Sequence, residues 1–315
     1  MALADAPDAV IETMLRRYYL EDARKLDIAN ELGMSRFKVA RLLEDAKRRG
    51  LVRIEIVPSA ADPERSERLR RALGLRRAIV VADTVGRDPE TVRRAVGRLS
   101  ARLLTELAGR ESIVGISASL ALIAMGEEIV SLGDSTVVQL NGVLSSQVAG
   151  GGPVELVRDV AAKCSGRARV FYAPFVTPTI ASAQDLRRDP SIRWAMAAFS
   201  RLDIAVVSVG RWASGMSGLY DSLKEWERAE LAEAGAIGEV CGVIVDRDGA
   251  PVASPATERV LGISYPELRR VPEVIAVVHT GSRAPAVRAL AAGKLITSIV
   301  TSADVADEIL DETTQ

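Results

Sequence analysis

The chain has 315 residues and a formal net charge of −1 at pH 7, so its length favours two domains and its charge excludes a generally polybasic or polyacidic binding protein. Hydrophobic residues make up 48% of the sequence, enough for a sizeable core, and no run approaches the roughly 18 apolar residues that a membrane span needs. The single histidine, His279, nearly excludes histidine-based catalysis, and Cys164 and Cys241 lack metal-type spacing.

The first predicted element is a packing helix over residues 9–20, AVIETMLRRYYL. Val10, Met14, Leu15 and Tyr18 recur at helical spacing and are expected to face inward. Acidic residues precede the arginines near the N-terminus, which is the reverse of a secretion signal. We therefore expect a cytoplasmic protein, and we predict neither a metal nor a cofactor.

Residues 26–56 then predict a helix-turn-helix motif. With Lys25 as its first position, Ala29 falls where the two helices cross closely, and Gly33 falls in the turn, where a positive φ is cheap only without a Cβ. Val39 falls on the buried face of the second helix, for which Ser35 is a good N-cap. Residues 51–57 alternate in polarity like the strand of a wing or a linker strand.

Charge supports a nucleic-acid interpretation of this motif. Between positions 35 and 53, seven basic and two acidic residues give a net charge of +5, which is typical of phosphate-binding surfaces. In such motifs the start of the second helix reaches base edges in the major groove. The candidate base contacts are Ser35, Arg36, Phe37, Lys38 and Arg41. The candidate phosphate contacts are Lys25, Lys47 and Arg53.

An ordinary amphipathic helical hairpin with a solvated charged face is the alternative interpretation of the same stretch. Amphipathic helix pairs are common, so each feature alone is weak. The combination of Ala29, Gly33 and Val39 at mutually correct offsets with a basic face favours binding to double-stranded operator DNA.

A shift to Pro, Ala, Ser and charged residues over 58–71 marks a domain junction, which predicts domains at 1–57 and 58–315. Beyond it, a clear helix is predicted at 88–107, with Asp88 and Pro89 at its start and Val92, Val96, Leu99 and Leu103 facing inward. Short β-rich runs alternate with such helices, and this pattern predicts an α/β fold with a doubly wound, mostly parallel sheet. The runs are 76–83, 112–117, 136–142, 169–174, 203–210, 240–246, 274–279 and 296–302.

Ligands of open parallel sheets bind at the carboxyl ends of the strands. That rule selects residues suited to a polyhydroxylated small molecule, neutral or anionic. They are Gly115, Ser117, Ser119, Gln139, Asn141, Gly210, Asp246 and Arg283.

Each of these residues has a structural alternative. Ser117 and Ser119 are also good helix caps, and the amides of Gln139 and Asn141 could satisfy only the loop backbone. Asp246 lies in the sequence DRDG, a good hairpin turn. Arg283 could be a surface residue at a helix start, although a positive charge there opposes the helix dipole.

The order of elements resembles the SorC family of sugar-responsive bacterial transcription regulators over nearly the whole chain. The motifs that carry the resemblance are IANELGMSRFKVARLLEDAKRRGLVRIEI, GIS at Gly115, VQLNG at Val138, APFV at Ala173, DIAVVSVG at Asp203, LYDSL at Leu219, GAIGEVCGVIVDRDG at Gly235, RVLGIS at Arg259, and VPEVIAVV with LITSIVTSADVADEIL near the end.

The resemblance implies an N-terminal helix-turn-helix domain, winged-helix-like, that binds DNA. It also implies a Rossmann-like effector domain resembling glucosamine-6-phosphate deaminase and ribose-5-phosphate isomerase, which binds sugar phosphates or polyols without turning them over. A homodimer or homotetramer is expected, because operators of such motifs are usually read by dimers.

This chain departs from the family pattern at the phosphate loop and near the C-terminus. Ser119 and Ala121 replace a glycine and a threonine, and Arg283 takes the place of a lysine. His279 and Thr280 stand where two glycines are usual, and Ser302 replaces an aspartate. These changes predict an unusual effector, bulkier or unphosphorylated, or a weakened site.

The predicted function is a DNA-binding regulator whose operator binding a carbohydrate-type effector controls. The alternative is a sugar-phosphate isomerase or deaminase with an appended DNA-binding domain, which would need a general base and an acid near pH 7. A module that binds a partner other than DNA is a third possibility, and the +5 stretch argues against it.

Overall fold

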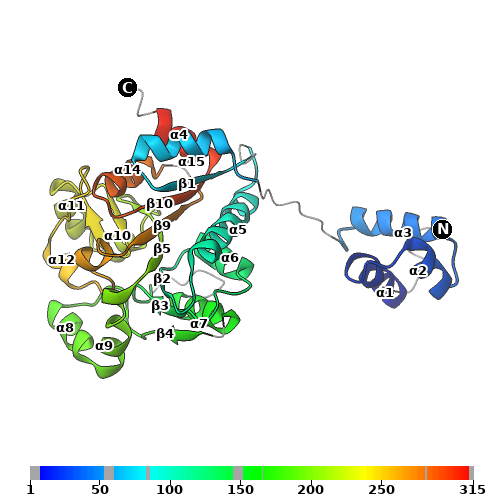
Figure 1. Cartoon of the computed structure of the whole chain (residues 1–315), viewed down its shortest axis with the longest axis horizontal. Helices are drawn as coiled ribbons and strands as arrows, with labels where there is room; N and C mark the ends of the chain where they lie inside the picture. Colours follow the sequence, from blue (N-terminus) through cyan, green and yellow to red (C-terminus); the bar gives the residue numbers. More distant parts are fainter. Residues whose placement is uncertain are drawn as a thin grey trace. The chain divides into compact units, whose positions relative to one another are not determined.

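The computed structural model describes residues 8–52, 60–82, 86–144, 152–164, 166–280 and 282–311. The chain divides into two units, Met1–Ile56 and Val57–Gln315, which are drawn in Figure 1. Arg53 lies outside the described residues. So does the strand predicted over 51–57, except for positions 51 and 52.

Three helices form the first unit around a small apolar core (Figure 1). They are α1 (Asp8–Tyr19), α2 (Lys25–Glu31) and α3 (Arg36–Arg48). Met14 is buried as predicted, but Ile11 rather than Val10 supplies the other fully buried side chain of α1. Ile28 and Ala29 of α2 pack against Val39, Leu42 and Leu43 of α3, which confirms the predicted helix pair.

A seven-stranded sheet organises the second unit, with the order β1-β10-β9-β5-β2-β3-β4 and only parallel pairs. The predicted doubly wound parallel sheet is therefore confirmed. Its strands are β1 (Arg77–Val81), β2 (Ile113–Ile116), β3 (Thr136–Gln139), β4 (Arg167–Arg169), β5 (Ile204–Ser208), β9 (Glu273–Val278) and β10 (Ser298–Ser302).

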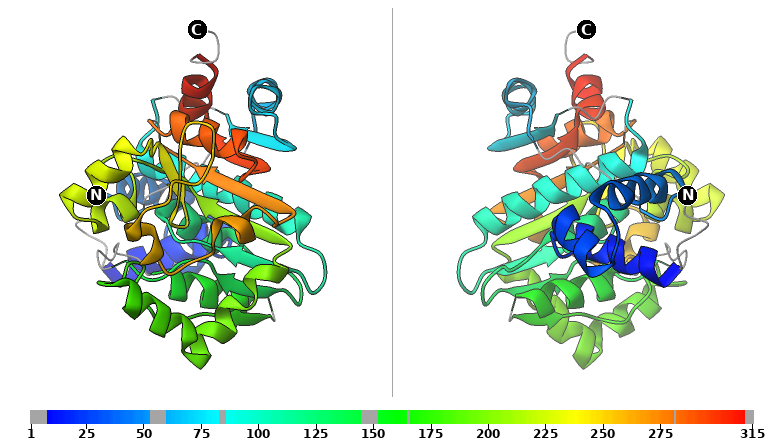
Figure 2. Two further views of the ribbon diagram at one scale, coloured as in Figure 1. Left: turned by 90° about the vertical axis from the view of Figure 1, so that its left-hand side faces the viewer. Right: turned by 90° about the vertical axis from the view of Figure 1, so that its right-hand side faces the viewer.

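Helices cover both faces of this sheet because neighbouring strand residues point to opposite sides. Val137 and Val206 pack in the core beneath the helices over 89–107, 120–128 and 153–163. Val138 and Val207 pack in the core beneath the helices over 63–73, 180–188, 190–196, 265–268, 284–292 and 303–311. Figure 2 shows the helix over 89–107 lying across one face.

The helices of the second unit have the following bounds. They are α4 (Pro63–Leu73), α5 (Pro89–Leu107), α6 (Leu120–Glu128), α7 (Pro153–Lys163), α8 (Ile180–Arg188), α9 (Pro190–Met196), α10 (Gly218–Ser222), α11 (Glu225–Glu233), α12 (Pro255–Glu258), α13 (Tyr265–Leu268), α14 (Ala284–Ala292), α15 (Ala303–Asp311) and the 3-10 turn Phe199–Arg201.

Helix α5 begins as the sequence predicts. Asp88 is its N-cap, with the carboxylate accepting from the backbone N–H groups of Glu90 and Thr91 at 3.1 and 3.0 Å. Pro89 occupies the first turn, where a missing N–H costs nothing. The predicted inner residues Val92, Val96, Leu99 and Leu103 are all buried.

A separate antiparallel sheet corrects one strand prediction. It contains β6 (Gly210–Arg211), β7 (Gly238–Val240) and β8 (Val243–Val245), so residues 240–246 are part of a hairpin and not one strand of the parallel sheet. Cys241 and Gly242 turn the chain between paired Val240 and Val243, with φ angles of 53° and 90°. Two consecutive positive φ angles are the hallmark of a tight two-residue hairpin turn.

Strand β4 also differs from the prediction of a strand over 169–174. It ends at Arg169, because the backbone N–H of Phe171 donates to the Oε1 atom of Gln139 at 3.0 Å instead of continuing the strand ladder.

The sheet has a switch point between β2 and β5. From β2 the chain builds outward to β3 and β4, and from β5 it builds in the opposite direction to β9 and β10. Ligands of doubly wound sheets bind in the crevice at such a point.

Candidate functional site

The turn of the first unit has the geometry of a helix-turn-helix. Gly33 has a φ of 62° and a Cβ placed there would meet open space, so the turn needs glycine for its backbone conformation. Ser35 caps α3, with its Oγ accepting from the backbone N–H of Lys38 at 3.2 Å.

Helix α3 presents the candidate DNA contacts on its solvent side. Ser35, Arg36, Phe37 and Arg41 are exposed, Lys38 is half-buried, and Phe37 is 73% exposed. The Arg36 guanidinium lies 4.9 Å from the centre of the Phe37 ring, so the two side chains form one exposed cation–aromatic pair.

The candidate phosphate contacts Lys25 and Lys47 are exposed as well. Their ammonium groups lie 5.4 Å from the ring of Tyr18 and 5.9 Å from that of Tyr19. The third candidate, Arg53, lies outside the described residues.

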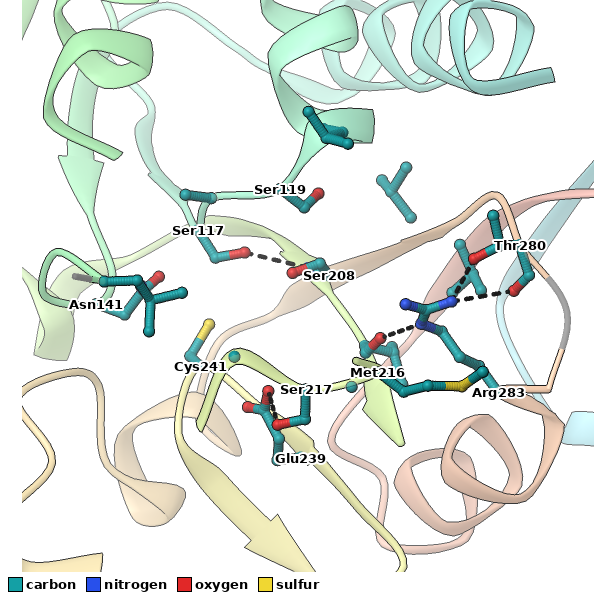
Figure 3. Close-up of a pocket in the computed structure, with 18 of the residues that line it drawn as sticks. Ser117, Ser119, Asn141, Ser208, Met216, Ser217, Glu239, Cys241, Thr280 and Arg283 are labelled. Carbon is teal, nitrogen blue, oxygen red and sulfur yellow. Dashed lines mark hydrogen bonds between the residues drawn. The ribbon is translucent and has the colours of Figure 1, made fainter. Parts of the chain in front are cut away.

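A cavity of about 360 Å³ opens in the second unit at the carboxyl ends of β2, β3, β5 and β9 (Figure 3). The structure brings five of the eight residues chosen from the sequence to its wall. They are Ser117, Ser119, Asn141, Gly210 and Arg283.

The two serines also serve the backbone, as the alternative interpretation anticipated. The Ser119 Oγ caps α6 by accepting from the Leu122 N–H at 3.3 Å. The Ser117 Oγ accepts from the Ser208 N–H at 3.1 Å and so ties the ends of β2 and β5 together (Figure 3).

Asn141 and Gln139 behave differently, although Gln139 ends β3 and Asn141 follows two residues later. Asn141 lines the cavity, its Nδ2 donates to the Gly142 carbonyl oxygen at 3.0 Å, and its buried Oδ1 has no hydrogen-bond partner among the described residues. Gln139 is fully buried away from the cavity, with its Nε2 donating to the Asn141 carbonyl oxygen at 2.9 Å. Gln139 therefore does not line this cavity, and its amide serves the loop backbone.

Two other residues chosen from the sequence do not line the cavity. Gly115 lies within β2, and a Cβ there would come within 2.5 Å of the Leu140 side chain, so this glycine serves packing. Asp246 follows β8 of the antiparallel sheet, and its Oδ1 accepts from the N–H groups of Asp248 and Ala250, both at 2.9 Å. Asp246 therefore stabilises the DRDG turn. The rule that ligands bind at the carboxyl ends of strands concerns parallel sheets, and β8 belongs to the antiparallel sheet.

Arg283 is positioned at one side of the cavity. Its Nε donates to the Val209 carbonyl oxygen at 3.0 Å, and its Nη1 donates to the carbonyl and hydroxyl oxygens of Thr280 (Figure 3). Burial lowers the pKa of this guanidinium, and the nearby Glu239 carboxyl opposes the shift.

Glu239, which was not among the residues chosen from the sequence, lies beside Ser217 in the wall of the cavity (Figure 3). Its Oε1 accepts from the Ser217 hydroxyl at 3.1 Å and its Oε2 from the Gly242 N–H at 3.0 Å. Burial raises the pKa of its carboxyl. A lone acidic residue inside the apolar run before Cys241 was the available signal, because buried acids are rare without a partner.

His279 and Cys241 also line the cavity, and both are neutral near pH 7. Burial, Arg283 and Arg93 lower the pKa of His279 to about 4. Burial and the Glu239 carboxyl raise the pKa of the Cys241 thiol. Neither group is therefore poised for proton transfer or nucleophilic attack at neutral pH.

Within the described ranges, no group of three or more His, Cys, Asp or Glu side chains is arranged to hold a metal ion. The same part of the chain contains no helix that is both long and apolar enough to cross a membrane.

Residues 57–311 match the Sugar-bind family model, whose description is "Putative sugar-binding domain". The chain belongs to this family. Its relatives include the transcriptional regulator LsrR of Klebsiella pneumoniae, which is 28% identical over 98% of this chain and 94% of LsrR. LsrR of Escherichia coli K12 is 24% identical over 93% of this chain and 92% of its own length.

Solved structures share the fold. The full-length sorbitol operon regulator SorC from Klebsiella pneumoniae superposes with a TM-score of 0.72 at 21% identity, covering 96% of this chain and all of SorC. A transcriptional regulator from Streptococcus pneumoniae gives 0.73 at 20% identity, covering 80% of this chain and 97% of that one. The resemblance to SorC-type transcriptional regulators inferred from the motifs is thus confirmed.

Proposed function

We propose that the N-terminal unit binds operator DNA and that the cavity of the second unit binds the carbohydrate-type effector that controls this binding. In this proposal the protein acts in the cytoplasm as a homodimer or homotetramer, since one helix-turn-helix reads only a half-site. Arg36, Phe37, Lys38 and Arg41 contact bases, and Lys25 and Lys47 contact phosphates.

The position of the cavity is the main support for the proposal that the second unit binds an effector. It lies at the switch point of a doubly wound sheet, and hydroxyl, amide, carboxyl and guanidinium groups converge on it from four strand ends and the antiparallel sheet. Such a mixture of donors and acceptors suits a ligand with many hydroxyl groups.

The raised pKa of Glu239 favours a second candidate, an isomerase or deaminase, because such shifts are typical of catalytic acids. We consider binding without turnover the better supported function. A proton shuttle also needs a base. His279 has a pKa of about 4, and the Asp221 carboxylate already accepts from the Gly215 N–H at 3.1 and 3.2 Å. Conversion of any sugar phosphate by the purified protein would support the enzyme instead.

Titration of the full chain onto labelled DNA from upstream of its own coding region tests the DNA half of the proposal. We expect sequence-specific binding that weakens as salt rises, because phosphate contacts release counterions. Arg36→Ala should lower specific affinity about 10–100-fold, the effect of roughly 1–3 kcal/mol per base contact.

Arg110→Ala is the matched control, since Arg110 is a highly exposed arginine of the second unit. It should leave DNA affinity unchanged. Equal effects of the two substitutions, or no specific binding at either salt, would contradict the assignment of α3.

A further inference from the structure

The cavity has an accepting side built from Asn141 and Glu239. Asn141 is only 6% exposed, and its Oδ1 is buried without a hydrogen-bond partner among the described residues. Glu239 is 8% exposed and presents its carboxyl to the same space. Buried acceptors normally have a donor, so a ligand that supplies hydroxyl protons matches this side.

The described residues that line the cavity do not have a net positive charge. Of the described residues that line it, Asp221 and Glu239 are acidic, Arg283 is basic, and His279 is neutral at pH 7. The net charge is therefore −1 with Glu239 ionised and zero with Glu239 protonated. Neither state offers the excess positive charge that attracts a phosphate dianion.

Arg283, the basic residue among the described residues that line the cavity, already uses most of its donors within the protein. The Nε and Nη1 atoms of Arg283 donate to Val209 and Thr280, which leaves Nη2 without a partner among the described residues. A guanidinium recognises phosphate best when two N–H groups on one edge are free to pair with it, and here one nitrogen remains for a ligand.

The start of α6 offers backbone N–H groups to the same cavity. Ser119 caps Leu122 there, and Ala118, Ser119 and Leu120 line the cavity. Such donors serve an anion well, but they bind a hydroxyl oxygen equally without a formal charge. This feature alone therefore does not select a phosphate.

Building on the proposed function, we infer that the effector is an uncharged, polyhydroxylated carbohydrate whose hydroxyl groups donate to Asn141 Oδ1 and to Glu239, and that its phosphorylated form is the weaker ligand. The discrimination comes from Glu239 as a repulsive element against anions, and from Asn141 as an acceptor that a hydroxyl satisfies.

Calorimetric titration of the full chain at pH 7 with matched ligand pairs tests this inference. The probes are glucitol with glucitol 6-phosphate, ribose with ribose 5-phosphate, and inorganic phosphate as competitor. We expect the unphosphorylated member of at least one pair to bind at least tenfold tighter than its phosphorylated partner. Inorganic phosphate should not displace it.

Three variants connect the result to named residues. Glu239→Gln should reduce the discrimination at least threefold, because the repulsion of phosphate is gone. Asn141→Ala should weaken the neutral ligand about tenfold and keep the discrimination. Glu230→Gln, an exposed position on α11, is the matched control and should change neither. Thermal melting checks that each variant is folded. If Glu239→Gln does not fold, Asn141→Ala still tests the inference.

The possible failures can be told apart. A tighter phosphorylated member in the pairs that bind would overturn the inference and leave the regulator proposal intact. Binding by no member of any pair would also overturn the inference. If operator binding then remained specific but indifferent to every probe, the effector half of the proposed function would fail as well.

Discussion

His279 is the only histidine of the chain, so its titration can be isolated in a stability measurement. Its folded-state pKa is lowered to about 4 by burial, Arg283 and Arg93, from an ordinary value of 6.5. Between those two values the unfolded chain binds more protons than the native protein. The stability that neutral His279 contributes is therefore present above pH 6.5 and is lost as the pH falls towards 4.

We predict that the free energy of unfolding falls by about 2 kcal/mol more between pH 7 and pH 5 in the wild-type chain than in His279→Gln. Denaturant unfolding at the two pH values measures the difference. An identical pH dependence in both proteins would show that the imidazole titrates normally and is more exposed than the structure places it.

The rule that ligands bind at the carboxyl ends of parallel strands correctly placed five residues at the cavity, because they follow strands of the parallel sheet. They are Ser117, Ser119, Asn141, Gly210 and Arg283. The rule could not find Glu239 or Cys241. Both come from the antiparallel hairpin of β7 and β8, so they do not follow the carboxyl end of a parallel strand. Gln139 was chosen from the sequence but does not line the cavity. The sequence gives no sign that the backbone N–H of Phe171 donates to its amide oxygen.

At the scale of elements, the hairpin of β7 and β8 could not be distinguished from a single strand by its sequence pattern. The run VCGVIVD is rich in β-branched residues on both sides of its turn, and the first turn position is a cysteine at a φ of 53°. Turn signals in a sequence rely on Gly, Asn and Asp at such positions, so Cys241 gives none. By contrast, α5 was predictable to within a residue because Asp88, Pro89 and its apolar stripe agree.

The packing of α5 on α6 depends on Gly97. A Cβ at this position would lie 2.8 Å from the Met125 backbone nitrogen and 2.9 Å from the Ala124 carbonyl carbon, and backbone atoms cannot move aside as a side chain can. Gly97→Ala should therefore destabilise the second unit by about 1–2 kcal/mol, because overpacking exceeds the gain in helix propensity.

Thermal and denaturant unfolding measure this effect. Gly109→Ala is the control, since its nearest neighbour, the Ser112 Oγ, would lie at an ordinary 3.7 Å. A Gly97→Ala variant as stable as the wild type would mean that α5 and α6 are farther apart than the structure has them.

At the scale of the whole molecule, the two units of the chain carry different chemistry. The first has a basic helix and an exposed Arg36–Phe37 pair, and the second has a cavity lined by hydroxyl, amide and carboxyl groups. A ligand in one unit can change DNA binding by the other only if it binds one arrangement of the units better than another.

The central claim is that carbohydrate binding and operator binding are coupled in this chain. The most direct measurement is the dissociation constant for labelled operator DNA at fixed salt, without ligand and with a saturating amount of the carbohydrate found by calorimetry. The account predicts a change of at least fivefold, within the usual range of coupling free energies of about 1–3 kcal/mol. The Arg36→Ala variant should bind the operator about 10–100-fold more weakly with or without the ligand. An operator affinity that stays the same at saturating ligand would contradict the account.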